Sequence, residues 1–441
     1  MDVELQIQRH LARDARPTVG FIDNYCSHYK SIFPEVRSYE CFKYLHLGML
    51  SAIKRKSLPE IANVVGINST QSLHHFIAQS PWSVEELRKL RLSRILCLLK
   101  GNSIIVVVDE TGDRKKGKTT DYVARQYLGS VGKVDRGIVT VNAYGIYLGI
   151  TFPLIFKIFK PKGTLKPNDE YKTKIAIATE IIDELVELGF KIELVLGDSL
   201  YGEANSFLRR LDEYSLPFAV AIRSNHSEWM PANQRVRANK WHQFERTFSN
   251  DTSETRYIRE IIFGKKRKRT SWEITTDPET MPPNSTSFVM TNIQGKVKKR
   301  LGNFYGLRTW VEYGFRQCKQ ELGWTEYRFT KYREIQRWWE VIFSAYLMIG
   351  INALSRKSFK QPPQDNNETE NQNVIFSSHT QWDMEKGWKN TLNNLRLIIQ
   401  PTIVLWLIWP WLEVFPNHNL LLGLHNLIGV MNQFSSYYPD G

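Results

Sequence analysis

Hydrophobic and polar positions divide the chain into a helical part and a part in which strands alternate with helices. Residues 1–98 have the pattern of helices. From Ser103 the pattern changes, and Ile104 to Val108 form an unbroken β-branched run that is typical of a central strand buried on both faces. Apolar runs and amphipathic stretches then follow one another, which predicts an α/β layered core.

The core is predicted to hold several further strands separated by two helices. Gly189 is the expected stop of the first helix, and Gly197-Asp198 ends the strand that follows it. The expected helices are Tyr171 to Leu188 and Ser199 to Glu213, and the expected strands are Val123 to Tyr127, Gly137 to Tyr147, Ile150 to Phe159, Lys191 to Leu196, Pro217 to Arg223 and Ser287 to Ile293.

Changes in composition and hydrophobic pattern indicate how the chain is divided into domains. Short polar segments, tryptophans and a basic run interrupt the core over residues 228–284, which we interpret as a β-rich insertion. Residues 356–378 are rich in Gln, Asn, Ser and Pro, the composition of a flexible linker. The expected division is therefore a helical domain at 1–98, for which DNA binding is considered below, a core at 99–227 and 285–355, and a helical C-terminal region at 379–441.

A short segment of the first domain has the pattern of a helix-turn-helix over residues 58–79. Leu58 to Val65 is predicted to form a helix that ends at Gly66, and Asn68 or Ser69 would cap a second helix through Gln79. Such a unit resembles a DNA-reading helix-turn-helix. Any small helical hairpin has a similar pattern, so both interpretations stay open at this point.

Positive charge favours a polyanionic partner. The 441 residues include 59 Lys and Arg against 45 Asp and Glu, which gives a formal net charge of +14 and a pI near 9.4. Cationic surfaces gain affinity for nucleic acids by releasing counterions from phosphates. A basic protein without such a partner has the same composition, so charge alone does not decide between the two.

Cysteines and apolar segments bear on where the protein works. The four cysteines form no C-x-x-C pair, which predicts free thiols in a reducing cytoplasm and no structural zinc site. The apolar stretch from Leu397 to Phe415 contains two prolines and Glu413. We interpret this stretch as helices buried on the core rather than as a membrane span, and we expect a cytoplasmic, nucleoid-associated protein with no membrane partner.

Three carboxylates occupy positions at which they are candidate metal ligands. Asp109 and Asp198 each follow an apolar strand, so both are expected at the carboxyl edge of the sheet, where open α/β sheets place their sites. The alternatives are a turn for Asp109 and a helix cap for Asp198. Glu312 lies on a predicted helix further along the chain. Carboxylates that converge from such elements are oxygen ligands suited to Mg²⁺.

A polar stripe surrounds the third of these acids. Tyr305, Arg308, Glu312 and Lys319 are separated by three, four and seven residues, which places them on one face of a helix. A tyrosine, two cations and a carboxylate do not make a core stripe, but they suit a phosphodiester backbone and a metal ion. Together with the two aspartates, the stripe predicts metal-dependent nucleic-acid chemistry.

These motifs resemble one known family. The spacing Y-x2-R-x3-E-x6-K of the stripe is similar to the signature of a large group of DDE transposases from bacterial insertion sequences. The segment from Asp109 to Gly145 and the segment LGDSLYGE, Leu196 to Glu203, look like the regions of the first and second aspartates in that group. The resemblance covers residues 100–355 and implies an RNase H-like core with a β-rich insertion between the second and third acids.

The resemblance also implies an activity. Asp109, Asp198 and Glu312 would bind two Mg²⁺ ions, with Mn²⁺ as a substitute. Water would cut a phosphodiester bond at a transposon end, and the freed 3′-hydroxyl would attack target DNA. Some relatives pass through a hairpin. The partners would be double-stranded DNA, namely terminal inverted repeats and target, and a second copy of the chain in the DNA complex.

Further DNA contacts are expected from the stripe and the insertion. The resemblance implies that Tyr305, Arg308 and Lys319 hold phosphates near the scissile bond. Trp272 or Trp241 is the candidate for stacking on a flipped base. A basic run is expected to contact the DNA backbone, although a solvated loop has the same pattern; it consists of Lys265, Lys266, Arg267, Lys268 and Arg269.

Neighbouring acids and other functions are the remaining alternatives. Glu110, Glu203, Glu321 and Glu326 lie close in sequence to the three chosen acids. Glu321 is nine residues beyond Glu312, half a turn around a regular helix, so we expect it to face away. A metal-dependent RNase H-like nuclease without strand transfer and a catalytically silent DNA-binding protein are the competing functions.

Overall fold

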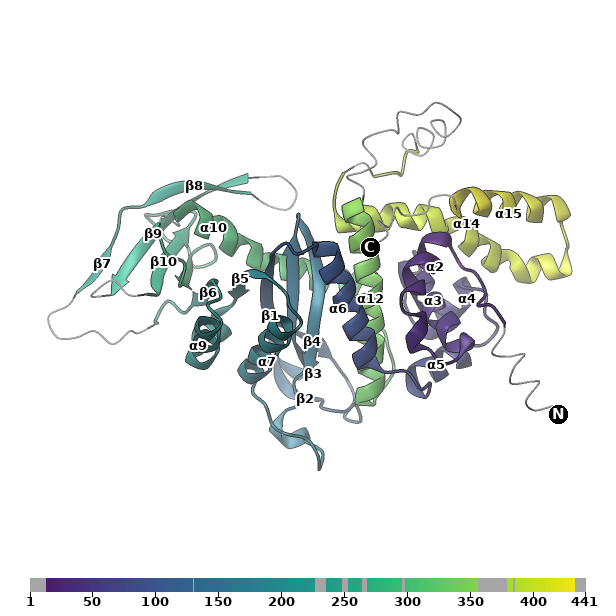
Figure 1. The fold of residues 1–441 in the computed structure, drawn as a ribbon, viewed down its shortest axis with the longest axis horizontal. Helices are drawn as coiled ribbons and strands as arrows, with labels where there is room; N and C mark the ends of the chain where they lie inside the picture. The colour runs from purple at the N-terminus through teal and green to yellow at the C-terminus, as the bar shows by residue number, and fades with distance from the viewer. Residues whose placement is uncertain are drawn as a thin grey trace. The chain divides into compact units, whose positions relative to one another are not determined.

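The computed structural model describes residues 13–129, 131–226, 235–247, 253–263, 268–295, 298–355, 379–383 and 385–432. The expected linker at 356–378 lies outside them. The chain forms two compact units (Figure 1). A helical unit comprises residues 1–98, 119–121 and 316–441, and a sheet unit comprises residues 99–118 and 122–315. Residues 316–355, which the sequence-based division placed in the core, thus pack with the helical unit.

A large mixed sheet is the framework of the sheet unit. Its strands follow the order β2-β3-β1-β5-β6-β11-β10-β9-β7, while β4 pairs with β3 and β8 with β9. The core strands are β1 (Ile104–Arg114), β2 (Ala124–Leu128), β3 (Lys133–Tyr147), β4 (Ile150–Ile158), β5 (Ile192–Gly197) and β6 (Phe218–Ile222). Strand β1 runs antiparallel to β3 and parallel to β5. This α/β architecture is consistent with the expected RNase H-like core.

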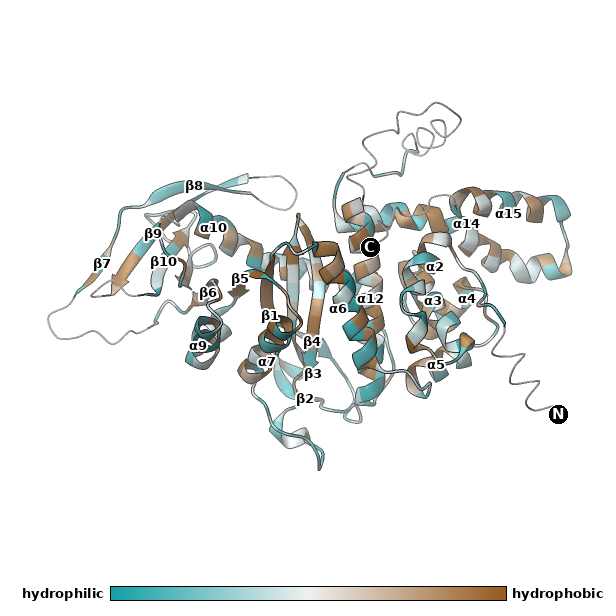
Figure 2. Cartoon of the chain, in the orientation of Figure 1, coloured by the Kyte–Doolittle hydropathy of each residue, from teal (hydrophilic) through white to brown (hydrophobic). Residues whose placement is uncertain are grey.

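The apolar run at the start of β1 is buried, as expected. Ile104 to Val108 are at most 9% exposed, and Figure 2 shows β1 and β5 in hydrophobic colours. Helices α7 (Lys174–Glu187) and α9 (Asn205–Glu213) lie beside one another next to this sheet (Figure 1). The side chain of Thr173 caps α7 by accepting from the amide of Ala176. A short 3-10 turn, η2 (Lys162–Thr164), precedes α7.

The predicted insertion is β-rich, and it extends the central sheet instead of forming a separate one. Its strands are β7 (Val236–Ala238), β8 (His242–Thr247), β9 (Ser253–Phe263) and β10 (Thr270–Thr275), followed by β11 (Ser287–Thr291). Strand β11 joins them to β6, because it pairs with β10 on one side and with β6 on the other. Helix α10 (Lys298–Gly306) packs on β6, β8 and β9.

The helical unit is built around helices α3 and α12, which contact each other. Both are largely buried, and Trp338 and Trp339 are among the largest fully buried side chains. The elements of this unit are α2 (Gly20–Ser27), η1 (Lys30–Ile32), α3 (Val36–Leu50), α4 (Leu58–Val64), α5 (Gln71–Ala78), α6 (Val84–Leu99), η4 (Gln317–Glu321), α12 (Tyr332–Ser355), α14 (Trp388–Val414) and α15 (His418–Asn432).

Helices α4 and α5 form the helix–turn–helix predicted at 58–79. Gly66 has a φ of 70°, a conformation that favours glycine at a helix end. The ring of Trp406 packs so closely here that a Cβ on Gly66 would lie 2.2 Å from it. Leu73, Phe76 and Ile77 bury one face of α5. The opposite face, with Gln71 and His75, is exposed, and its contact with DNA stays a prediction.

The C-terminal helices differ from expectation. The first half of α14 is buried, but its second half and α15 expose large apolar side chains, including Trp411 and Val414. The expectation that Leu397 to Phe415 would be buried throughout is therefore wrong, because the buried residues of α14 end at Leu405. By length and composition, α14 is the one helix among the described residues that could cross a membrane.

Candidate active site

Asp109 lies inside β1 and not at its end. The strand continues to Arg114, and Asp109 pairs with Asn142 of β3. Parallel pairing with β5, however, stops at Val108 opposite Gly197. The expected strand end and the alternative turn are both wrong here, because β3 continues the pairing of β1 beyond the point where β5 stops.

Asp198 follows β5 directly, so both aspartates come one residue after the same pair, Val108 and Gly197. Its Oδ1 accepts a hydrogen bond of 2.9 Å from the amide of Leu200, which caps α8 (Ser199–Gly202). The capping alternative is thus correct, and it fixes the carboxylate beside β1. The approach of α8 to β6 requires a glycine, because a Cβ on Gly202 would lie 1.8 Å from the carbonyl oxygen of Ala221.

Glu312 lies in α11 (Trp310–Arg316), which is separated from α10 by the 3-10 turn η3 (Leu307–Thr309). The predicted helix is therefore continuous, but its hydrogen bonding changes to 3-10 at η3 and to π at η4. Gly314 and Phe315 seat α11 on β3. A Cβ on Gly314 would lie 2.6 Å from the ring of Tyr144, and the ring of Phe315 meets that of Tyr144 edge-on at 5.4 Å.

The members of the predicted stripe fall into both units. Tyr305, Arg308 and Glu312 belong to the sheet unit, whereas Lys319 lies in η4 of the helical unit. The structure thus places three of the four residues within one unit, on three consecutive short helical segments. The role of Lys319 stays a prediction.

The two aspartates form a strained electrostatic pair. The pKa of Asp109 is raised to about 7, first by burial and then by the nearby charge of Asp198, whose effect exceeds the lowering by Arg308. A carboxylate whose ionised form is disfavoured by burial and by a like charge is stabilised by an added cation. The electrostatics of this pair therefore favour cation binding.

Arg308 lies between the first and third acids. Its guanidinium nitrogens are 3.9 Å from Oδ2 of Asp109 and 4.0 Å from Oε1 of Glu312. Both distances exceed those of a hydrogen bond, so the attraction is electrostatic and loosely held. Glu312 remains 57% exposed, in contrast to Asp109 at 14%. The ring of Tyr305 lies 6.0 Å from the guanidinium, and burial raises the pKa of its hydroxyl.

Arg246 is a neighbour of the site that sequence reasoning missed. It lies on β8 and donates a hydrogen bond of 3.1 Å to the carbonyl oxygen of Gly306, at the junction of α10 and η3. Burial lowers the pKa of its guanidinium. A lone arginine on a strand of the insertion carries no sequence signal, because only the folded sheet brings it to the turn before Arg308.

Buried polar atoms near the acids test whether a metal fits. Within the described part of the chain, three buried oxygens have no hydrogen-bond partner: Oε2 of Glu110, Oδ1 of Asn142 and the hydroxyl of Tyr201. Burial raises the pKa of Tyr201 most, and the charges of Glu110, Asp109 and Asp198, in that order, raise it further. Oxygen donors of this kind fit a hard divalent cation. Among the described residues no three metal-ligating side chains are grouped closely enough to hold a metal ion.

The competing acids are already engaged. Glu110 pairs with Lys174 at 2.8 Å, and Glu203 pairs with His226 at 2.9 Å. In the helical unit, Glu321 pairs with Lys389 at 2.6 Å and with Arg396 at 3.0 Å, and Glu326 accepts from the amide of Lys56. These partners favour structural roles for all four.

The structure describes only part of the basic run that is expected to contact DNA. Lys265, Lys266 and Arg267 lie outside the described residues. Lys268 is exposed, whereas Arg269 pairs with Asp212 at 2.6 Å.

The two tryptophans of the insertion differ in what their rings can reach. Trp272 is only 4% exposed and donates to the hydroxyl of Thr270, so its ring is packed within the sheet and has no face open to a base. Stacking by Trp272 stays a prediction, and it would require the sheet to expose this ring. Trp241 is partly exposed and lies 4.3 Å from the guanidinium of Arg259.

Comparison with known proteins places these features in one group. A family model described as DDE superfamily endonuclease matches residues 32–247, and one described as transposase DDE domain matches residues 164–348. The chain is 54% identical over 312 residues to a protein of Microchaete diplosiphon named probable transposase for insertion sequence element IS701. The match covers 70% of this chain and 82% of that protein.

Proposed function

Since this chain belongs to the DDE transposases of insertion sequences, we propose that it cuts DNA at transposon ends and joins the freed 3′-hydroxyl to target DNA. Asp109, Asp198 and Glu312 are the proposed catalytic acids. The observation that carries the proposal is the placement of Asp109 and Asp198 side by side after one strand pair, with the pKa of Asp109 raised to about 7.

The three acids would hold Mg²⁺, or Mn²⁺ in its place. When bound, the metal supplies Lewis-acid activation of water and stabilises charge on the phosphate and the leaving oxygen. Asp109 and Asp198 already stand on rigid elements, the strand β1 and the cap of α8. Glu312 completes the set from α11, whose seat on Tyr144 fixes the backbone and leaves the side chain exposed.

Arg308 has two proposed tasks. Without DNA it lies between Asp109 and Glu312 and offsets part of their negative charge. In the DNA complex its guanidinium turns to a phosphate oxygen, for which its planar fork of donors is suited. Tyr305 supports it from one side, and Arg246 holds the turn that carries it.

The other proposed partners follow from the family. The DNA is double-stranded and includes terminal inverted repeats and a target. A homodimer in the DNA complex would present two ends together. The exposed face of α5, with Gln71 and His75, is the proposed reader of the end sequence.

The test is cleavage of the DNA that flanks the gene, with and without Mg²⁺, by the wild type and by Asp198→Asn. Asn caps a helix as well as Asp does, so this variant removes the charge while keeping α8 in place. We expect metal-dependent cutting by the wild type, joining of the product to a second duplex, and neither reaction with the variant. Binding to the ends should persist.

Each outcome separates two functions. Cutting without joining would favour a nuclease of the same fold. Tight binding to the ends without cutting would favour a silent DNA-binding protein. Equal cutting by Asp198→Asn and by the wild type would contradict the assignment of the acid site.

A further inference from the structure

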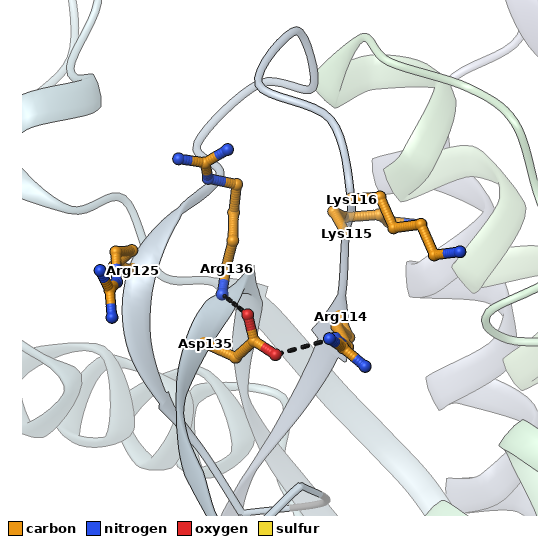
Figure 3. A pocket seen from close by; sticks show the side chains of 6 residues that line it. All are labelled: Arg114, Lys115, Lys116, Arg125, Asp135 and Arg136. Atoms are coloured by element: carbon orange, nitrogen blue, oxygen red, sulfur yellow. Dashed lines mark hydrogen bonds and ion pairs between the residues drawn. The ribbon is translucent and has the colours of Figure 1, made fainter.

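A basic pocket lies in the sheet unit away from the acids. It has a volume of about 450 Å³, and its lining comes from the end of β1 with the residues that follow it, and from β2 and β3 (Figure 3). Five cations and one carboxylate line it, and one of the cations, Lys115, is paired at 2.8 Å with Asp113, which leaves an excess of three positive charges. The lining residues are Arg114, Lys115, Lys116, Arg125, Asp135 and Arg136.

The single carboxylate organises the pocket without neutralising it. Asp135 accepts 2.7 Å from the amide of Arg136 and 2.8 Å from Nε of Arg114, as Figure 3 shows. The Arg136 amide is the main reason that the pKa of Asp135 is lowered, and the charges of Arg114 and Arg125 add to it. Within the described chain, no carboxylate lies within ion-pair distance of the guanidinium of Arg125 or Arg136.

The strand register brings two of these cations face to face. Arg125 of β2 lies directly opposite Arg136 of β3. Like charges at such a position destabilise a strand pair, and an anion bound between them removes the repulsion. Two residues along the same face, Tyr127 lies opposite Val134, and both are more than half exposed. An exposed aromatic beside paired arginines is the composition of a nucleic-acid surface and not of a core.

Strand β1 connects this pocket to the acid pair. Arg114 lies five positions after Asp109 on one continuous strand, a span of about 17 Å at the rise of a β-strand. Alternation turns the Arg114 side chain to the opposite face, but Arg136 lies six positions from Asn142, the partner of Asp109 on β3, and so shares the face of Asp109. The same distance along B-form DNA corresponds to about five base pairs. A duplex whose scissile phosphate is at Asp109 therefore has backbone phosphates within reach of the pocket.

We propose that this pocket binds the phosphate backbone of the duplex about half a helical turn from the cut. The inference rests on the proposed function, because the cut must occur at Asp109 and Asp198. The cations contact phosphates and read no bases, so they hold the duplex in register with the acids whatever its sequence.

The experiment compares the wild type with the double variant Arg125→Gln and Arg136→Gln. The matched control removes two exposed cations elsewhere in the same unit, Arg209→Gln with Lys191→Gln. Dissociation constants are measured over a range of salt concentrations, with end duplexes that extend 3 or 12 base pairs beyond the cut on each side. Thermal unfolding and circular dichroism verify that the variants fold.

The expected result concerns the side of the duplex that reaches the pocket. Wild type and control bind more tightly once that side extends more than about five base pairs beyond the cut, and the pocket variant does not. On the long duplex the salt slope of the pocket variant falls by about 2, which corresponds to roughly 30-fold weaker binding at 0.15 M salt. Equal slopes and equal length dependence for variant and control would overturn the proposal.

A second measurement distinguishes binding of DNA from binding of a free phosphate. A pocket built for a small anion would bind pyrophosphate more weakly in the variant while the length dependence of DNA binding stays intact, and this result would also overturn the proposal. Failure of the proposed function shows separately, as absence of metal-dependent cutting by the wild type. Loss of the length effect together with absent cutting would support the pocket and contradict the catalytic assignment.

Discussion

Both units contain arginines close to carboxylates, but the distances and the burial of these side chains differ. In the helical unit, Nε of Arg91 lies 2.6 Å from Oε1 of Glu340, and both side chains are fully buried. Arg88 holds the other oxygen of Glu340 at 3.2 Å. In the sheet unit, Arg308 lies 3.9 Å from Asp109 and 4.0 Å from Glu312, and Glu312 is mostly exposed. One arrangement is closed and hydrogen-bonded, and the other is loose.

This difference distinguishes an ion pair that stabilises the fold from a group of charges that is able to bind a ligand. Glu340 has both oxygens satisfied, so nothing is gained by moving it. The acids near Arg308 are short of positive charge, because burial and Asp198 oppose the ionisation of Asp109. A bound cation or phosphate can rearrange the charges around Arg308 at a low cost in free energy. The pair of Arg91 and Glu340 gains nothing from a ligand, so a change there only removes its hydrogen bonds.

The largest expected effect is on catalysis, from Glu312→Gln. The variant loses a proposed metal ligand that supplies several kcal/mol of charge stabilisation, so cleavage should fall about a thousandfold or more. Affinity for the ends should remain. The matched control is Glu321→Gln, which disturbs only the ion pairs with Lys389 and Arg396. Loss of cleavage in Glu321→Gln alone would show that the third acid is misassigned.

Breaking the closed arrangement should cost stability and not chemistry. Glu340→Gln leaves Arg91 buried without a counter-charge, and such changes destabilise proteins by about 3–5 kcal/mol. Urea unfolding followed by tryptophan fluorescence measures the change, since Trp338 and Trp339 lie on the same helix. A shift below about 1 kcal/mol would mean that the pair is not the anchor that its geometry indicates.

The loose arrangement should be the one that responds to pH. The folded state holds a proton on Asp109 up to about pH 7, whereas the unfolded chain releases it near 3.8. Between these values the folded state binds more protons, so the stability of the metal-free protein should fall as pH rises from about 4 to 7. The full shift corresponds to at most about 4 kcal/mol.

Asp109→Asn tests this dependence. The variant should remove that slope and raise the melting temperature at pH 8 without metal, while abolishing cleavage. Melting curves at pH 5 and pH 8, with and without Mg²⁺, measure the effect. Mg²⁺ should stabilise the wild type at pH 8 and leave Asp109→Asn nearly unchanged. A variant less stable than the wild type at pH 8 would contradict the electrostatic account of the pair.

Local pattern determined much of this protein in advance. The β-branched run predicted the buried start of β1, and the spacing of Tyr305, Arg308 and Glu312 identified a polar helical segment. The β-rich character of residues 228–284 was also predictable. These features depend on period and residue type, which a sequence displays directly.

Only the tertiary structure decided which charges meet. The place of Arg308 between two acids, the approach of Arg246 and the facing of Arg125 and Arg136 depend on strand register and on the 3-10 turn within the helix. The burial of Trp272 depends on the sheet that the insertion joins. Sequence spacing specifies which residues share a local face, but partners and burial are set by packing between residues far apart in the chain.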